Sequence, residues 1–174
     1  MPLLNYAQGH NPAADKPWTS AWLLALLLSG SLGLDSASAQ TQTEQAVERG
    51  RYLVQASGCN DCHTPGYPEA AGQVDERLWL TGSPLGWRGP WGTTYASNLR
   101  QVVQELDEQQ WLSHARAPRR PPMPWFNLRV MSDADLTAIY HYLRHLGAAG
   151  DAMPAYVPAG QEPQGPYVQF PAAP

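Results

Sequence analysis

The alternation of apolar and polar residues predicts helices in three parts of the chain, beginning with residues 44–57. In this segment Val47, Leu53 and Val54 fall near one face at helical spacing, and acidic residues occupy the first turn. Gly50 lies in its middle, where glycine is less favourable than alanine by about 1 kcal/mol. We therefore expect a second helix to cross at close range there.

The second helical stretch covers residues 100–116, in one piece or two, with Asp107 as a candidate N-cap. The third covers residues 132–146, with Ser132 as its N-cap and Gly147 after its end. It carries the clearest apolar stripe: Leu136, Ile139, Tyr140 and Leu143. His141 and His145 have metal-ligand spacing but project from the opposite side, so we expect them to face solvent.

No long periodic segment is found elsewhere. Residues 64–98 are divided by glycines and prolines, and a strand over residues 77–81 has weak support. A loop this long is usually functional or supported by a ligand. Residues 148–174 are rich in proline, so we expect an extended tail that wraps the surface or hangs free.

The N-terminus resembles a secretory signal peptide. Residues 21–28 form an apolar run, Lys16 precedes it, and Ala37-Ser38-Ala39 supplies a small-residue cleavage pattern. The run is shorter than the roughly 20 residues of a membrane span. We expect residues 1–39 to be removed on export, with retention as a membrane anchor as the alternative.

Length and charge restrict what remains. The 174 residues suit one domain, which we place at residues 40–147, followed by the tail. Removal of residues 1–39 lowers the acids from 15 to 13 and the bases from 11 to 10, for a net charge of −3. Lys16 is the only lysine in the chain, so neither nucleic acid nor a partner that needs a lysine-rich surface is indicated.

The two cysteines of the chain lie in the motif Cys59-Asn60-Asp61-Cys62-His63. On one helical turn, Cys59 and Cys62 project from the same side, and His63 leaves that side too. Two thiols so placed reach the vinyl groups on one haem edge, and the imidazole reaches the iron. The spacing thus predicts one covalent haem c.

Three other interpretations apply to the same motif. A disulfide between Cys59 and Cys62 would close too small a loop to stabilise the fold much. A thiol–disulfide active site is expected within a βαβ pattern, which the sequence lacks. A zinc site needs four ligands, and the remaining histidines are scattered.

The second axial ligand is predicted to be Met123. Prolines flank it on both sides and exclude a helix, so its thioether lies on a stiff extended loop. A Met opposite a His raises the haem potential and suits electron transfer. The alternatives are Met131, which is also explained as a hydrophobic staple, Met153, His114 or an open position.

Together these motifs resemble the class I-like bacterial mono-haem cytochromes c, including cytochrome subunits of periplasmic dehydrogenases. The likeness covers residues 46–146 through G-R-Y-L, C-N-D-C-H, P-P-M-P-W and S-D-A-D-L. It implies a small all-α fold wrapped around one covalent haem, with long irregular loops, in which the first and last helices cross.

The resemblance also implies the site residues. Cys59 and Cys62 match the thioether cysteines, His63 the proximal ligand and Met123 the distal ligand. Three further residues match positions near the haem: Tyr95, Asn98 and Trp125. One departure is Arg100-Gln101-Val102, where relatives commonly continue Asn-Leu with Thr-Pro-Asp.

The function implied is that of an exported carrier of single electrons, not an enzyme, which exchanges electrons with redox proteins such as a dehydrogenase donor or an oxidase acceptor. The chain can also be a dedicated subunit of a periplasmic dehydrogenase. An open iron position would instead favour a gas sensor or a peroxidase-like enzyme. Arg116, Arg119 and Arg120 either guide an acidic partner or form a solvated basic surface. A membrane is involved only if the N-terminal segment is retained.

Overall fold

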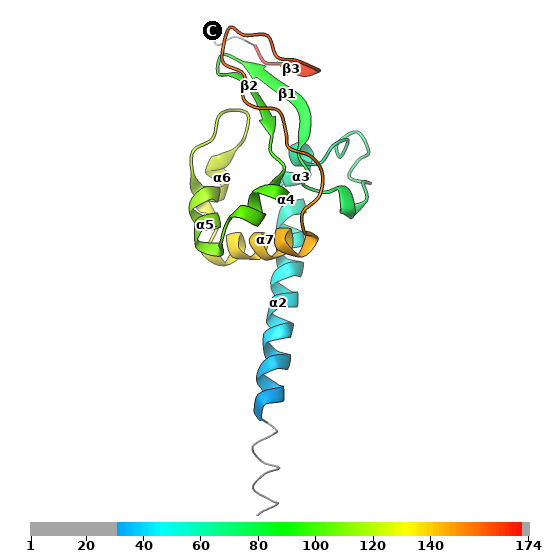
Figure 1. Ribbon diagram of the computed structural model, residues 1–174, viewed down its shortest axis with the longest axis vertical. Coiled ribbons are helices and arrows are strands. Elements are labelled where there is room, and N and C mark those ends of the chain that lie inside the picture. Colours follow the sequence, from blue (N-terminus) through cyan, green and yellow to red (C-terminus); the bar gives the residue numbers. More distant parts are fainter. Residues whose placement is uncertain (1–30, 172–174) are drawn as a thin grey trace, which may run out of the picture. The chain divides into compact units, whose positions relative to one another are not determined.

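The computed structural model of the protein describes residues 31–171, with side chains from residue 41 onward (Figure 1). It falls into two units, Met1–Gln40 and Thr41–Pro174. The apolar run predicted as a signal peptide, residues 21–28, lies outside the described residues. Within the described part, no helix is long and apolar enough to cross a membrane.

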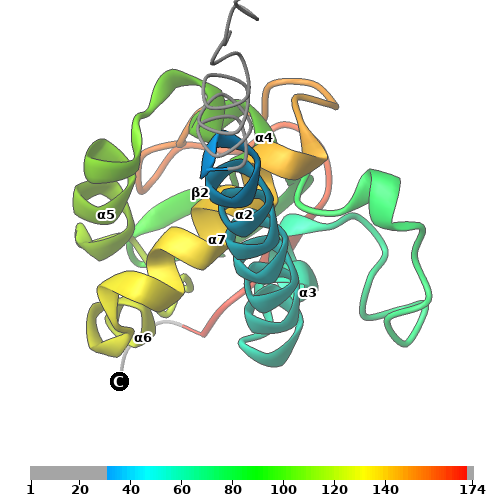
Figure 2. The ribbon, with the colours of Figure 1, turned by 90° about the horizontal axis from the view of Figure 1, so that it is seen from below.

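Helix α2 (Ser31–Ala56) contains the segment predicted over residues 44–57 but begins earlier. Helix α7 (Asp133–Leu146) crosses it at Gly50 (Figure 2). A Cβ atom on Gly50 would lie 2.0 Å from the carbonyl oxygen of Ala138 and 2.7 Å from Cβ of Tyr142. The close crossing expected at Gly50 is therefore confirmed.

The helices between α2 and α7 add Val103, Trp111, Leu112 and Ala115 to the core, and Trp79 and Leu80 enter it from a turn. The predicted segment over residues 100–116 is broken into α4 (Leu99–Val102), a 3₁₀ turn η2 (Val103–Glu105) and α5 (Glu108–Arg116). Asp107 caps α5 as predicted, in a capping box with Gln110. Trp111 of α5 donates its indole N–H to the carbonyl of Leu136 over 2.8 Å, which joins α5 to α7.

Helix α7 begins after Ser132, whose hydroxyl accepts the backbone N–H of Asp135, and ends before Gly147, as the sequence predicts. Its inward face carries buried side chains: Leu136, Ala138, Ile139, Tyr142 and Leu143. Of the two histidines, His145 is exposed and His141 is partly exposed, with its Nε2 3.5 Å from Glu108.

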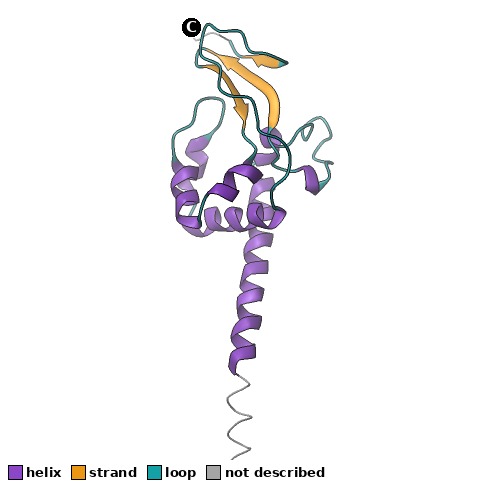
Figure 3. Ribbon diagram, in the orientation of Figure 1, coloured by secondary structure: helices purple, strands orange, loops and turns teal. Residues whose placement is uncertain are grey.

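A small sheet lies beside the helices (Figure 3). Strands β1 (Ser83–Gly89) and β2 (Gly92–Ala96) form an antiparallel hairpin, and β3 (Tyr167–Gln169) pairs in parallel with β1, giving the order β2-β1-β3. A 3₁₀ turn, η1 (Glu76–Leu78), overlaps residues 77–81, where a strand has only weak support from the sequence. The fold is mainly helical, as predicted, and the hairpin is the addition that the sequence did not reveal.

Candidate functional site

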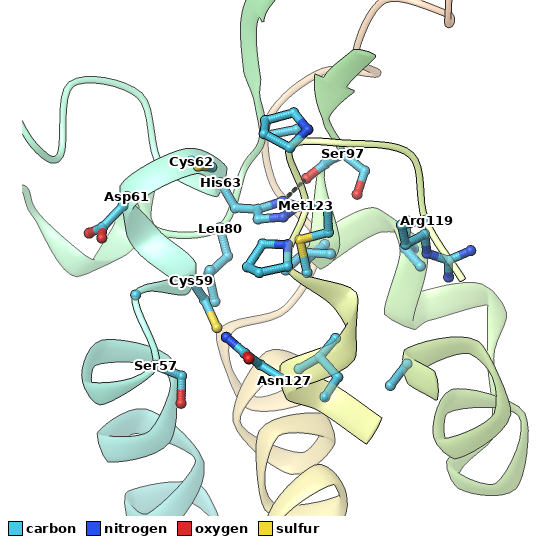
Figure 4. Close-up of a pocket in the computed structure, with 18 of the residues that line it drawn as sticks. Ser57, Cys59, Asp61, Cys62, His63, Leu80, Ser97, Arg119, Met123 and Asn127 are labelled. Carbon is cyan, nitrogen blue, oxygen red and sulfur yellow. Dashed lines mark hydrogen bonds between the residues drawn. The ribbon is translucent and has the colours of Figure 1, made fainter. Parts of the chain in front are cut away.

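One cavity of about 1010 Å³ lies between the cysteine-containing turn, the hairpin and the loop that carries Met123 (Figure 4). This volume is at the upper end of the range for small-molecule sites, which is about 300–1000 Å³. Cys59, Cys62, His63, Tyr95 and Met123 all line it. The structure thus brings together five of the seven site residues that the sequence predicts.

His63 is held with one ring nitrogen occupied and the other available. It lies at the end of α3 (Cys59–His63), and its Nδ1 is 2.8 Å from the carbonyl oxygen of Ser97. Because a carbonyl only accepts hydrogen bonds, Nδ1 carries the proton and Nε2 keeps its lone pair. Burial lowers the pKa of His63, against the opposing effect of the Ser97 carbonyl, and this shift favours the neutral ring. A neutral imidazole with a fixed tautomer is the form that binds a metal ion.

The two cysteines are free thiols on one turn of helix. Burial raises the pKa of Cys59 to about 11 and also raises the pKa of Cys62. A reactive thiol–disulfide centre needs a lowered pKa, so this environment opposes that interpretation. In residues 41–171, no group of three or more His, Cys, Asp and Glu side chains is arranged to hold a metal ion.

Polar contacts outside the predicted set fix the cysteine-containing turn. The Thr64 hydroxyl donates to Oδ1 of Asn60 over 2.7 Å and accepts the backbone N–H of Leu80 over 2.8 Å. The backbone N–H of Gly82 donates to the carbonyl of His63 over 2.8 Å. These contacts were not singled out from the sequence. Ser97 and Gly82 take part through backbone groups, which leave no residue pattern, and the bond between Thr64 and Asn60 joins two side chains that form no motif of their own.

Of the four candidates for the second axial ligand, three line the cavity and one does not. Met123, Met131 and His114 line the cavity. Met153 lies elsewhere, against Gly82, where its Cγ would be 2.5 Å from an added Cβ. Met123 occupies the loop of residues 117–124 between α5 and α6 (Trp125–Val130), whereas Met131 immediately precedes the cap of α7.

Two predicted neighbours, Asn98 and Trp125, are not part of the cavity lining. Asn98 caps α4 by accepting the backbone N–H of Gln101, and its amide donates to the carbonyl of Ala149 over 2.7 Å. Trp125 begins α6 and stacks under the guanidinium of Arg129 at 5.2 Å. Of Tyr95, Asn98 and Trp125, which the resemblance placed near the haem, Tyr95 is the one that lines the cavity.

Comparison with known proteins agrees with this arrangement. The family model described as Cytochrome c matches residues 47–147, which are 101 of the 174 residues. The gluconate 2-dehydrogenase cytochrome c subunit of Pantoea cypripedii is 28% identical over 136 residues, which cover 71% of this chain and 28% of that protein.

Two further relatives carry similar names. The alcohol dehydrogenase (quinone) cytochrome c subunit of Gluconobacter oxydans (strain 621H) is 28% identical over 140 residues, 71% of this chain and 26% of that protein. The fructose dehydrogenase cytochrome subunit of Gluconobacter japonicus is 33% identical over 113 residues, 60% of this chain and 23% of that protein. The chain therefore matches only about a quarter of the length of these relatives. No solved structure gives a significant match.

Proposed function

The chain belongs to the cytochrome c family, whose members hold haem c covalently, and we propose that it carries single electrons with His63 and Met123 as the axial ligands of the iron. The bound haem supplies a one-electron couple between ferric and ferrous iron. The cavity fits this group: Cys59 and Cys62 are available for two thioether bonds on the same turn as His63.

The observation that carries the proposal is the bond from Nδ1 of His63 to the Ser97 carbonyl, 2.8 Å long, inside a cavity that Met123 also lines. The bond orients the ring and leaves Nε2 for the iron. The apolar lining excludes water, and the prolines around Met123 limit the motion of its thioether. These roles are what an electron carrier requires of its protein.

The alternative with an open iron position is less well supported, because Met123 lines the same cavity as His63. The relatives instead favour an electron carrier that serves a dehydrogenase, since all three are named as cytochrome subunits of dehydrogenases. We propose such an enzyme as the electron donor. Export is also proposed, on the apolar run and the Ala37-Ser38-Ala39 pattern that follows it.

The test replaces Met123 by alanine. Met123→Ala is expected to abolish the Met–iron charge-transfer band of the ferric protein and to lower the reduction potential, because the thioether favours ferrous iron. Absorption spectra and a redox titration of the haem-loaded protein measure both effects. Met131→Ala is the matched control, since Met131 lines the same cavity.

The results separate the ligands directly. Loss of the band in Met123→Ala but not in Met131→Ala supports the proposed ligand. An unchanged band in Met123→Ala would contradict it. Rapid carbon monoxide binding by the reduced wild-type protein, as fast as in Met123→Ala, would instead support the open position and a sensor or peroxidase-like role.

The redox partner is proposed to dock on a basic surface around the Met123 loop. Residues 109–132 contain no aspartate or glutamate and four arginines. Arg116 pairs with Asp133, whereas Arg119, Arg120 and Arg129 form no ion pair with any described residue. We call these three arginines the basic rim.

Helix α6 carries two exposed apolar side chains close in sequence to the basic rim. Phe126 is 60% exposed and Val130 is 85% exposed. An apolar centre beside unpaired positive charge suits a partner with an acidic surface, because complementary charge speeds encounter and the apolar contact is buried on docking. The acidic partner, one of the two options left open by the sequence, is therefore the one we propose.

A further inference from the structure

The loop that presents Met123 has few bonds of its own. Prolines occupy four of its positions, 118, 121, 122 and 124, and therefore remove four backbone donors. Its backbone bonds are local: Trp125 donates to the carbonyl of Met123 and Asn127 to that of Pro124. Bonds from side chains must therefore fix the position of this loop.

Two side chains outside the helices make contact with the loop. The Thr94 hydroxyl on β2 donates to the carbonyl of Pro121 over 2.8 Å. The guanidinium of Arg120 lies 4.0 Å from the ring centre of Tyr156, in a cation–π contact. The loop is also joined to α5, where Arg119 donates to the carbonyl of His114 over 2.7 Å and the backbone N–H of Ala117 donates to the same carbonyl over 3.3 Å.

Tyr156 belongs to the segment of residues 148–171, which we call the strap. The hydroxyl of Tyr156 donates to the carbonyl of Trp91 over 2.7 Å. Next to it, the backbones of Val157 and Thr93 exchange two hydrogen bonds of 2.8 and 3.0 Å. Gly92 has a φ of +95°, and a Cβ there would lie 2.4 Å from the carbonyl oxygen of Val157, so the strap passes where only glycine leaves room.

The strap also pairs with β1, the strand on the other side of the hairpin from Thr93. Strand β3 pairs with β1, and Glu162 forms a 2.6 Å ion pair with Arg88. Phe170 packs against Trp91, with ring centres 5.3 Å apart, and against Trp87, which itself lines the cavity. The strap thus holds both edges of the hairpin and is well enough anchored to support the loop.

We propose that the strap is a positioning element for the axial methionine, in which Tyr156 holds Arg120 and thereby restrains the loop that carries Met123. The strap follows the region that the family model matches, which ends at residue 147. The proposal rests on the proposed ligation by Met123. Tyr156 acts through Arg120 and the loop, and it does not line the cavity.

The test measures how fast carbon monoxide binds to the reduced, haem-loaded full chain, since carbon monoxide must wait for Met123 to leave the iron. Tyr156→Ala is expected to bind it about twofold to fivefold faster, the change that loss of an exposed cation–π contact allows. Tyr156→Phe keeps the ring under Arg120 and is expected to stay near the wild type. The control is Tyr52→Ala, because Tyr52 is an exposed tyrosine of α2 that also lies under an arginine, Arg49, and belongs neither to the strap nor to the loop.

A second variant removes both contacts. Thr94→Val combined with Tyr156→Ala is expected to bind carbon monoxide faster than either single change and to weaken the Met–iron band. Wild-type rates in Tyr156→Ala and in the double variant, or an equal increase in Tyr52→Ala, would overturn the role of the strap. If Met123→Ala leaves the band intact, the ligation itself fails, which is a result distinct from failure of the strap.

Discussion

Arg100 is a buried arginine that binds carbonyl groups instead of an acid. It is 5% exposed, and its guanidinium donates to the carbonyls of Arg77 and Gly147 over 2.7 and 2.6 Å and to that of Leu146. Burial lowers its pKa. The carbonyls of Leu146 and Gly147 lie at the end of α7, where backbone acceptors lack helical partners. Arg100 therefore caps the C-terminal end of α7.

Replacement of this side chain tests its role at the scale of one residue. Arg100→Met keeps much of the length of the side chain but leaves the three backbone carbonyls without this donor. We expect the free energy of unfolding to fall by about 2–3 kcal/mol, measured by urea denaturation of the haem-loaded protein. Arg129→Met, at an exposed arginine without an ion pair, is the control. Equal stability of the two variants would contradict the capping role.

The sequence predicted the residues that would bind the haem better than it predicted the residues that hold them in place. Cys59, Cys62 and His63 were found from spacing, because covalent attachment dictates that spacing. Ser97 was missed because it contributes a backbone carbonyl, which any residue supplies. Asn98 is expected near the haem by resemblance, and in the structure its side chain caps α4 and donates to the start of the strap.

At the scale of elements, the helices followed from local signals and the hairpin did not. Helix α7 begins and ends where its cap residues predict, because capping and apolar spacing are properties of neighbouring residues. Strand β1 contains Pro84 and Gly86, which argue against a strand, and it is completed by pairing with residues 167–169 from far along the chain. Pairing over such a distance cannot be seen in a local pattern.

The crossing of α2 and α7 gives a prediction about two elements. Gly50→Ala places a methyl group 2.0 Å from the carbonyl oxygen of Ala138, so the helices must separate. We expect a loss of about 1–3 kcal/mol in the free energy of unfolding, the usual cost of overpacking, although alanine is the better helix former. Chemical denaturation measures it.

Gln45→Ala, at an exposed position of the same helix, is the control and is expected to change stability little. A Gly50→Ala protein as stable as the wild type would show that the two helices tolerate a wider separation.

At the scale of the whole molecule, the local distribution of charge is expected to govern the approach of small ions to the haem more than the net charge does. The chain has a net charge of −4, yet two arginines of the basic rim, Arg119 and Arg120, lie on the loop that carries Met123, and the third, Arg129, lies on the adjacent helix α6. Two of its members, Arg119 and Arg120, also line the cavity. A small anion that approaches the haem is thus attracted locally although the protein repels it overall.

Small redox reagents test this local field. Ferricyanide, an anion, is expected to oxidise the reduced protein about tenfold more slowly as the ionic strength rises from about 0.01 to about 1 M, where the screening length falls from about 30 to about 3 Å. The cation hexaammineruthenium is expected to show the opposite dependence. Stopped-flow spectroscopy measures both rates.

Exchange of all three arginines of the basic rim for glutamine should remove the dependence on salt, whereas Arg77→Gln, at an exposed arginine paired with Asp75, should retain it. If ferricyanide instead reacts faster as salt is added to the wild type, the net charge of the chain governs approach and the proposed docking surface is wrong.

The position of the strap late in the sequence leads us to expect a particular order of assembly. If the chain is exported from its N-terminus, Cys59 and Cys62 emerge before Tyr156 does, so the thiols are available before the strap pairs with the hairpin. A flat porphyrin enters most readily at that stage. Haem attachment is therefore expected to come first, with closure by the strap as the final step of assembly.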